Sequence, residues 1–404
     1  MQKTKSDKVL LIVAFALLLF GVVMITSIGV PKSIQLSAPD ILYPNCEQEG
    51  VDCYLLFKNH VIRIIIGAVA LLICAKIPYK FWRKIALPAF AAILFLLLVV
   101  LIAGKGFGTI AKSWLVVFNT SFQPAEFAKL ALIFYLARWM DEKSKDVESF
   151  QYGFIPFCVI AGLIVLPVVL QPDLGSTLVL SIIAVSIYFV AGAKFRHLAL
   201  GAFAAFLIAI MVIANVGHVR ERFVAYISLD QDCVEDYCWQ SEQANIAVGS
   251  GGFWGKGLTQ GVQKSYWLPQ ASDDFIFAAS AEELGFLRIF LVVIAYSVIA
   301  YRGYKIANTA PDRFSMLLAT GITTWVVAQA FINIGVNTGL LPVTGITLPL
   351  VSYGGSSILT TLIGLGILIN ISKYTTPYDT HRFHGRGNRR PYSAQYRLNS
   401  ETSD

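Results

Sequence analysis

Charged residues are scarce in this sequence. Only 14% of its 404 residues are Asp, Glu, Lys or Arg, whereas 56% are hydrophobic. Soluble globular domains carry about 25% charged residues, so a soluble class is excluded. The sequence also lacks a polar stretch long enough to form a separate soluble domain between its apolar runs. The composition therefore predicts a single integral membrane domain.

The apolar runs have about the length of 20 residues that a helix needs to cross a bilayer. They predict an all-α membrane protein, a bundle of about ten transmembrane helices, at 9–28, 61–77, 85–103, 125–140, 153–170, 174–193, 198–216, 275–301, 314–334 and 350–371. The first run follows a Lys-bearing start, as a signal peptide would. It is too long and lacks a small-residue cleavage site, so we interpret it as the first span.

The distribution of Lys and Arg predicts the orientation of the spans, because basic flanks are retained in the cytoplasm. Basic residues gather before the first run, between alternate later runs and after the last one. We therefore predict a cytoplasmic N-terminus at 1–8, a membrane domain at 9–372 and a basic, disordered cytoplasmic tail at 373–404. This topology explains the net charge of +7 and the arginines of the tail without a nucleic-acid site.

Two segments on the opposite, periplasmic side are unusually long, at 31–60 and 217–274. Cys46 and Cys53 lie in the first, and Cys233 and Cys238 lie in the second. Close cysteine pairs on the oxidising side of a membrane favour two local disulfides. A metal site is the alternative, but no histidine stands beside either pair, so disulfides are preferred.

Ionisable side chains in or beside membrane spans are costly, so each is a candidate functional residue. Glu126 and Lys129 stand three residues apart on a predicted helix, where they share a face and can neutralise each other. A structural ion pair and a catalytic role both remain open for them. Asp173 follows a helix-breaking Gln-Pro pair and precedes an apolar run, which favours capping of the next helix over catalysis.

Asp274 ends the longest loop, where the chain re-enters the membrane. A carboxylate under partly apolar cover can have a raised pKa and act as a general base, although an N-cap role is equally consistent with its position. The adjacent Asp273 would couple its titration to that of Asp274. The preceding glycine-rich stretch 249–257 departs from the phosphate-loop pattern. Its glycines permit exposed amides and close approach of a ligand, and Lys256 and Lys264 add charge suited to a pyrophosphate.

Several separated motifs together resemble one known family, the SEDS family (shape, elongation, division and sporulation). They occur in the family's order and run through nearly the whole membrane domain, at 113–115, 122–129, 171–176, 246–252, 268–278, 282–285 and 348–357. The resemblance implies a bundle of ten helices with a large periplasmic loop between helices seven and eight. It also implies a peptidoglycan glycosyltransferase that polymerises lipid II at the outer face of the inner membrane.

The resemblance aligns Asp274 with the family's proposed catalytic acid. It implies a substrate site, for which the candidates are Arg220, Arg222, Lys256, Lys264 and Ser352, and a supporting set of Glu126, Lys129, Asp173, Asp273 and Glu282. No cofactor is indicated, and a requirement for a divalent cation stays open. The family's usual Glu-Ala-His-Thr-Asp-Phe is replaced here by Gln-Ala-Ser-Asp-Asp-Phe at 270–275.

Within the family, 262–264, 268–271 and 347–349 resemble the division branch, FtsW, whereas 254–257 and 341–345 resemble the elongation branch, RodA. We favour FtsW. Either branch implies a class B penicillin-binding protein as transpeptidase partner, together with the division or elongation machinery. Two rival hypotheses are a lipid II flippase, which would need polar residues along the whole crossing, and a scaffold without catalysis.

Overall fold

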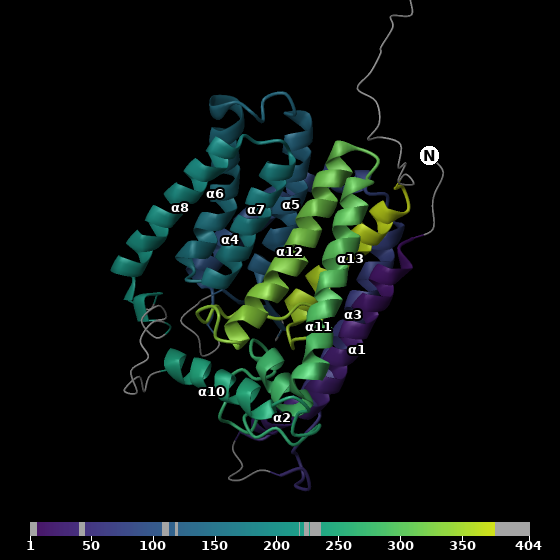
Figure 1. Ribbon diagram of the computed structural model, residues 1–404, viewed down its shortest axis with the longest axis vertical. Helices are drawn as coiled ribbons and strands as arrows, with labels where there is room; N and C mark the ends of the chain where they lie inside the picture. The colour runs from purple at the N-terminus through teal and green to yellow at the C-terminus, as the bar shows by residue number, and fades with distance from the viewer. Residues whose placement is uncertain are drawn as a thin grey trace, which may run out of the picture.

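The computed structural model describes residues 6–39, 45–106, 113–117, 120–217, 219–221, 226 and 236–375. Within these residues the chain is mostly helical, and its helices run side by side in an elongated bundle (Figure 1). The one sheet among them is a hairpin of β1 (Leu115–Val117) and β2 (Thr120–Phe122), which pairs Val116 with Ser121. The predicted tail beyond 375 and residues 1–5 lie outside the described residues.

Each predicted apolar run coincides with a helix, with ends that differ by a few residues. These helices are α1 (Lys8–Ile28), α3 (Leu55–Lys76), α4 (Lys80–Ala103), α5 (Pro124–Glu142), α6 (Ile155–Leu170), α7 (Leu174–Val190), α8 (Phe195–Asn215), α11 (Ile276–Asn308), α12 (Arg313–Asn337) and α13 (Gly355–Ser372). A π-helical turn, η1 (Phe150–Phe154), leads into α6. Two helices were not predicted, α2 (Val30–Ser37) and α10 (Asp236–Gly251), and both lie in the long loops.

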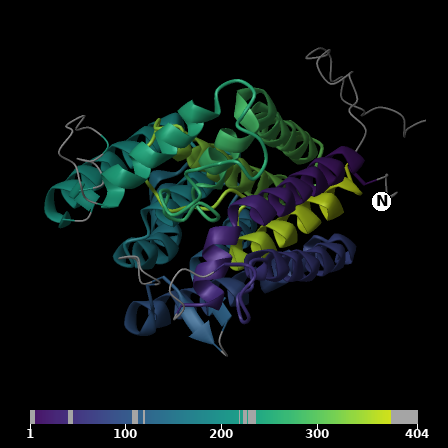
Figure 2. The same ribbon diagram turned by 90° about the horizontal axis from the view of Figure 1, so that it is seen from below.

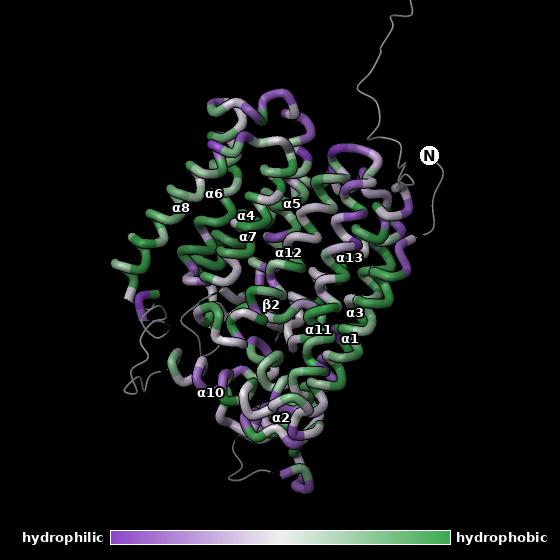
Figure 3. Tube along the Cα trace, viewed as in Figure 1, coloured by the Kyte–Doolittle hydropathy of each residue, from purple (hydrophilic) through white to green (hydrophobic). Residues whose placement is uncertain are grey.

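The class of the protein follows from these helices. In the described part of the chain, eight are long and apolar enough to cross a membrane. Hydrophobic residues occupy the middle of the bundle and hydrophilic ones gather at its two ends (Figure 3). The chain is thus an all-α, multi-pass membrane protein. Ten crossings stay a prediction, because α7 has 17 residues and α5 carries several charged side chains.

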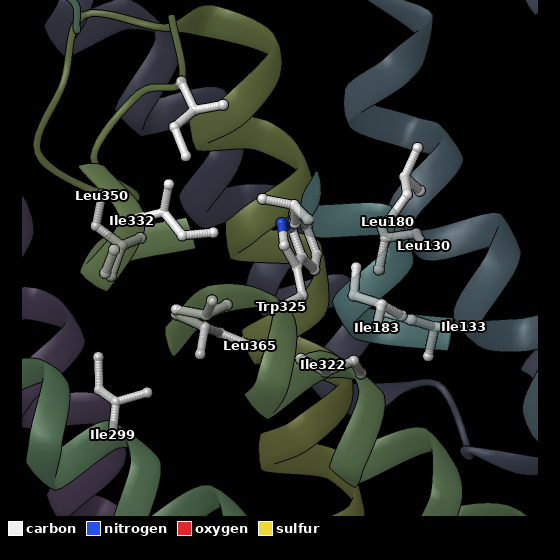
Figure 4. Close-up of a cluster of buried hydrophobic side chains, with 14 of the residues drawn as sticks. Leu130, Ile133, Leu180, Ile183, Ile299, Ile322, Trp325, Ile332, Leu350 and Leu365 are labelled. Atoms are coloured by element: carbon white, nitrogen blue, oxygen red, sulfur yellow. The ribbon is translucent and has the colours of Figure 1, made fainter. Parts of the chain in front are cut away.

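The core is built around α12, which packs against α5, α7, α11 and α13. The buried Trp325 of α12 lies among aliphatic side chains of these neighbours, as Figure 4 shows for Leu130 of α5, Ile183 of α7 and Leu365 of α13. In contrast, only 6% of the apolar stretch of α8 is buried, and this helix lies at the edge of the bundle (Figure 1). The tightly packed part of the molecule therefore excludes α8.

We call the end of the bundle that carries α2 and α10 the loop end; it is at the bottom of Figure 1 and is seen from below in Figure 2. Here Cys46 and Cys53 form the predicted disulfide, with their Cα atoms 5.7 Å apart. Cys238 is disulfide-bonded as well, while its predicted partner Cys233 lies outside the described residues. The alternative of a metal site at the first cysteine pair is therefore wrong.

Candidate active site

The glycine-rich stretch of the long loop packs against the first turns of α11. Gly285 interrupts α11 with a φ of +76°, which opens the helix for backbone pairing. The amides of Lys256 and Gly257 donate to the carbonyls of Glu282 and Glu283 at 3.0 and 2.9 Å. A Cβ on Gly255 would lie 2.2 Å from the carbonyl oxygen of Glu283. Gly255 and Gly285 therefore permit close approach of the loop to α11, whereas close approach of a ligand to the stretch stays a prediction.

Four side chains then fasten the loop to α11, and we call Lys256, Lys264, Glu282 and Glu283 the loop clasp. The Lys256 ammonium lies 2.7 Å from Glu282, and that of Lys264 lies 2.6 Å from Glu283. Both carboxylates are fully buried. Ser27 of α1 donates to Glu283 and accepts from Lys264 at 3.0 Å. Both lysine charges are thus engaged by buried carboxylates, and a substrate contact for either lysine stays a prediction.

Asp274 lies half-buried where the loop meets α11. Two asparagines one turn apart on α12 hold its backbone carbonyl, with the Nδ2 atoms of Asn333 and Asn337 donating at 2.7 and 2.9 Å. A Cβ on Gly345 would lie 3.7 Å from Oδ2 of Asp274. The N-cap of α11 is Phe275, and no side chain caps this helix. The alternative prediction, that Asp274 is the N-cap, is therefore wrong.

Asp273 has a different environment from its neighbour. Its carboxylate forms an ion pair with Lys32 of α2 and accepts a hydrogen bond from the Ser272 hydroxyl at 3.2 Å. The Lys32 ammonium also donates to Oε1 of Gln270 at 2.9 Å. No local sequence pattern marks Lys32 as a partner of Asp273. The charge of Lys32 compensates the Asp273 carboxylate.

Ser352, a predicted substrate contact, is buried beneath this segment. Its hydroxyl donates to the backbone carbonyl of Asp273 and accepts from the amide of Leu348 at 2.8 Å. The amide of Tyr353 donates to the carbonyl of Ser272 at 3.0 Å. These bonds tie the turn before α13 to the residues before Asp274. They favour a positioning role for Ser352 over direct contact with a substrate.

The remaining supporting residues lie within the bundle. Lys129 donates to Glu126 at 2.6 Å and to Oε1 of Gln329 at 2.8 Å, and both members of the ion pair are buried. Asp173 is the N-cap of α7 and accepts from the amide of Ser176 at 2.9 Å, which confirms the capping prediction. Arg220 is exposed, and Arg222 lies outside the described residues. No cluster of three or more His, Cys, Asp or Glu in the described part could hold a metal ion.

Comparison with known proteins identifies the family. The model of the FtsW, RodA and SpoVE family, described as cell cycle protein, matches residues 7–377. The chain belongs to this family. This confirms the resemblance found in its motifs.

Relatives of this FtsW/RodA/SpoVE protein cover it almost completely. It is 35% identical over 369 residues to a Geobacter sulfurreducens protein named "Probable peptidoglycan glycosyltransferase FtsW", covering 91% of this chain and 95% of the relative. It is 35% identical over 375 residues to stage V sporulation protein E of Bacillus subtilis strain 168, covering 93% and 99% of the two chains.

Solved structures agree. A chain of a peptidoglycan synthase complex, solved for the coordination of polymerization and crosslinking, is similar with a TM-score of 0.73 and 26% identity, covering 91% of this chain and 98% of that one. The rod shape determining protein RodA of Thermus thermophilus is similar with a TM-score of 0.65 and 25% identity, covering 92% and 98%. The fold of this FtsW/RodA/SpoVE protein is therefore that of RodA.

One signal in the sequence could have pointed to the asparagines that hold Asp274. Asn333 and Asn337 stand four residues apart around the end of the apolar run 314–334, so they share one helix face. Polar side chains on one face of a membrane helix indicate a hydrogen-bonded partner inside the bundle. No comparable local signal marks Lys32, whose partner is 241 residues away.

Proposed function

We propose that this protein is a peptidoglycan glycosyltransferase of the FtsW kind, which polymerises lipid II for septal wall synthesis with Asp274 as general base. Family membership and the names of its relatives support the activity. The observation that carries the assignment of the base is the position of Asp274 at the loop end, where the α12 asparagines hold its backbone carbonyl. The adjacent Asp273 is paired with Lys32.

The chemistry needs one carboxylate. Asp274 takes the proton from the 4-hydroxyl of the acceptor sugar, and the hydroxyl oxygen forms a bond to the anomeric carbon of the donor. The bond between that carbon and the lipid pyrophosphate breaks, so that the pyrophosphate leaves as an anion and the configuration inverts. Such a leaving group requires charge stabilisation more than protonation.

The site and its partners follow from this proposal. The loop end faces the periplasm, and both termini face the cytoplasm across the bacterial inner membrane, as the distribution of Lys and Arg supports. A class B penicillin-binding protein supplies the transpeptidase, and the division machinery recruits the pair. Likeness to a chain of a peptidoglycan synthase complex supports such a partner.

The test compares Asp274→Asn with the wild-type protein. The purified protein with its partner receives labelled lipid II, and glycan polymer is scored on a gel. We expect Asp274→Asn to lower the rate by about 100- to 10,000-fold, the usual cost of losing a general base, with an unchanged melting temperature and unchanged partner binding.

The neighbouring Asp273→Asn is the matched control, and we expect it to keep polymerising. Near-wild-type polymer from Asp274→Asn would overturn the assignment, and a loss confined to Asp273→Asn would move the base by one residue. Movement of labelled lipid II across vesicles by wild type, without polymer, would favour the flippase. Normal partner activation without polymer would favour the scaffold.

A further inference from the structure

Helix α13 begins with an uncapped turn rich in small residues. Its N-cap is Gly354, and no side chain caps the helix. The amides of Gly355, Ser356 and Ser357 have no intrahelical acceptor by position, and none donates to another described residue. Free amides and the helix dipole together favour a bound anion. This feature alone would not define a site, but two side chains of α3 stand beside it.

The first is Arg63, a half-buried cation without a carboxylate partner among the described residues. Its guanidinium carbon lies 4.3 Å from the centre of the Tyr353 ring, and a Cβ on Gly355 would lie 3.0 Å from its Nε. The guanidinium therefore stands at the first residue of α13. Lys256 and Lys264, in contrast, are held by the carboxylates of the loop clasp.

The second is His60, one turn before Arg63 on α3. Its side chain is fully buried, and its ring lies 6.1 Å from that of Tyr353, in a stacked arrangement. Neither ring nitrogen has a hydrogen-bond partner in the described structure. Buried polar groups are almost always paired, so two unpaired nitrogens against the ring of Tyr353, the residue before the N-cap of α13, indicate a partner that the described residues do not supply.

We call His60, Arg63, Tyr353 and the first amides of α13 the α3–α13 junction. One hydrogen bond links this junction to the segment that carries the candidate base. The Tyr353 amide donates to the carbonyl of Ser272, two residues before Asp274. We propose that the junction binds the pyrophosphate of the lipid-linked donor, which rests on the function proposed above. The junction thus takes the role in pyrophosphate binding that the sequence predicts for Lys256 and Lys264.

The chemistry of the junction fits two linked phosphates. A guanidinium binds phosphate oxygens with two parallel hydrogen bonds, helix amides add further donors, and an imidazole donates one more. Gly355 carries no side chain, so the Arg63 side chain can stand against the first turn of α13. The same donors stabilise the charge that develops on the pyrophosphate as it leaves.

The experiment measures binding without turnover. Purified protein in detergent is titrated with undecaprenyl pyrophosphate, and affinity is read from the thermal shift. We expect Arg63→Gln to bind roughly tenfold to a hundredfold more weakly than wild type, the range for a lost charge-assisted hydrogen bond. Arg63→Lys should recover part of the affinity, because it keeps the charge and loses the planar fork.

The matched control is Lys58→Gln. Lys58 lies on the same helix, is exposed and pairs with Asp52 at 2.8 Å, so this variant removes one charge outside the junction and should bind like wild type. Gly355→Ala is a second test without a change of charge. Its methyl group displaces the Arg63 side chain, and we expect binding a few-fold weaker.

Arg63-dependent binding of inorganic pyrophosphate would also support the proposal and would assign recognition to the phosphates alone. Equal affinity of Arg63→Gln and wild type overturns the proposal. A loss of affinity in Lys58→Gln as large as that in Arg63→Gln also overturns it. If Arg63→Gln does not fold, wild-type affinity in both Arg63→Lys and Gly355→Ala overturns it. Because the titration needs no turnover, a protein that makes no polymer can still pass or fail this test.

Discussion

The Glu126–Lys129 pair inside the bundle and the loop clasp at its end are both buried ionic structures, but they are assembled differently. Glu126 and Lys129 belong to one helix turn and gain Gln329 from α12 as a further partner. The loop clasp joins residues 19 and 26 positions apart, and it holds the long loop on α11. The first pair neutralises charge within one helix, whereas the clasp holds two segments of the tertiary structure together.

The comparison teaches how to separate structural from functional charge in this protein. Cations with buried carboxylate partners, such as Lys129 and Lys264, contribute to the fold. Arg63 has a ring beneath it and no carboxylate in the described structure, so its charge is available to a ligand. Breaking the paired set should therefore change stability, whereas changing Arg63 should change binding.

The largest expected effect is that of Glu126→Gln. Lys129 has no exposed surface, so the variant leaves a buried ammonium without the ionised carboxylate paired to it. Loss of one member of a buried pair costs about 3–5 kcal/mol, and the melting temperature in detergent should fall accordingly. Glu142→Gln on the same helix breaks an exposed pair with Arg138 and should cost no more than about 1 kcal/mol. Equal melting temperatures for the two variants would contradict the structural role.

A smaller and more local effect is expected for Glu283→Gln. Lys264 is 8% exposed and keeps Ser27 as partner, so we expect a cost of about 2–3 kcal/mol, that of a charged hydrogen bond. Because the clasp closes only the loop, residues 252–268 should exchange amide hydrogens faster while α12 stays protected. Hydrogen-exchange mass spectrometry measures this, and uniform loosening of the bundle would show that the clasp supports the whole fold.

The smallest effect is expected for Lys256→Gln. The Lys256 side chain is 34% exposed, and Glu282 keeps the amides of Val262 and Gln263 as donors at 3.0 Å. Stability should fall by less than in Glu283→Gln, because the Glu282 carboxylate keeps both amide donors. Binding of undecaprenyl pyrophosphate, measured by the same titration, should match wild type. A loss of affinity as large as that of Arg63→Gln would instead assign pyrophosphate binding to the long loop.

Local patterns predicted the contacts whose partners are close in the chain. The spacing of Glu126 and Lys129 gave their pair, the residues around Asp173 gave the cap of α7, and the separation of Cys46 and Cys53 gave their disulfide. Contacts between distant segments were not predicted. The pair of Lys32 with Asp273 is the clearest case, since no periodicity relates a loop helix to a residue 241 positions later.

The sequence by itself determined the membrane class, the approximate helices and the family, because hydropathy, turn residues and motifs act over short stretches of chain. Only the tertiary structure decided which charges of the long loop are paired. Lys256 and Lys264 have the composition of an anion site, yet packing of the loop on α11 buries carboxylates beside them, and a buried carboxylate must be neutralised. Packing of α3 against α13 likewise places Arg63 and His60 at a helix end that no local pattern connects to them.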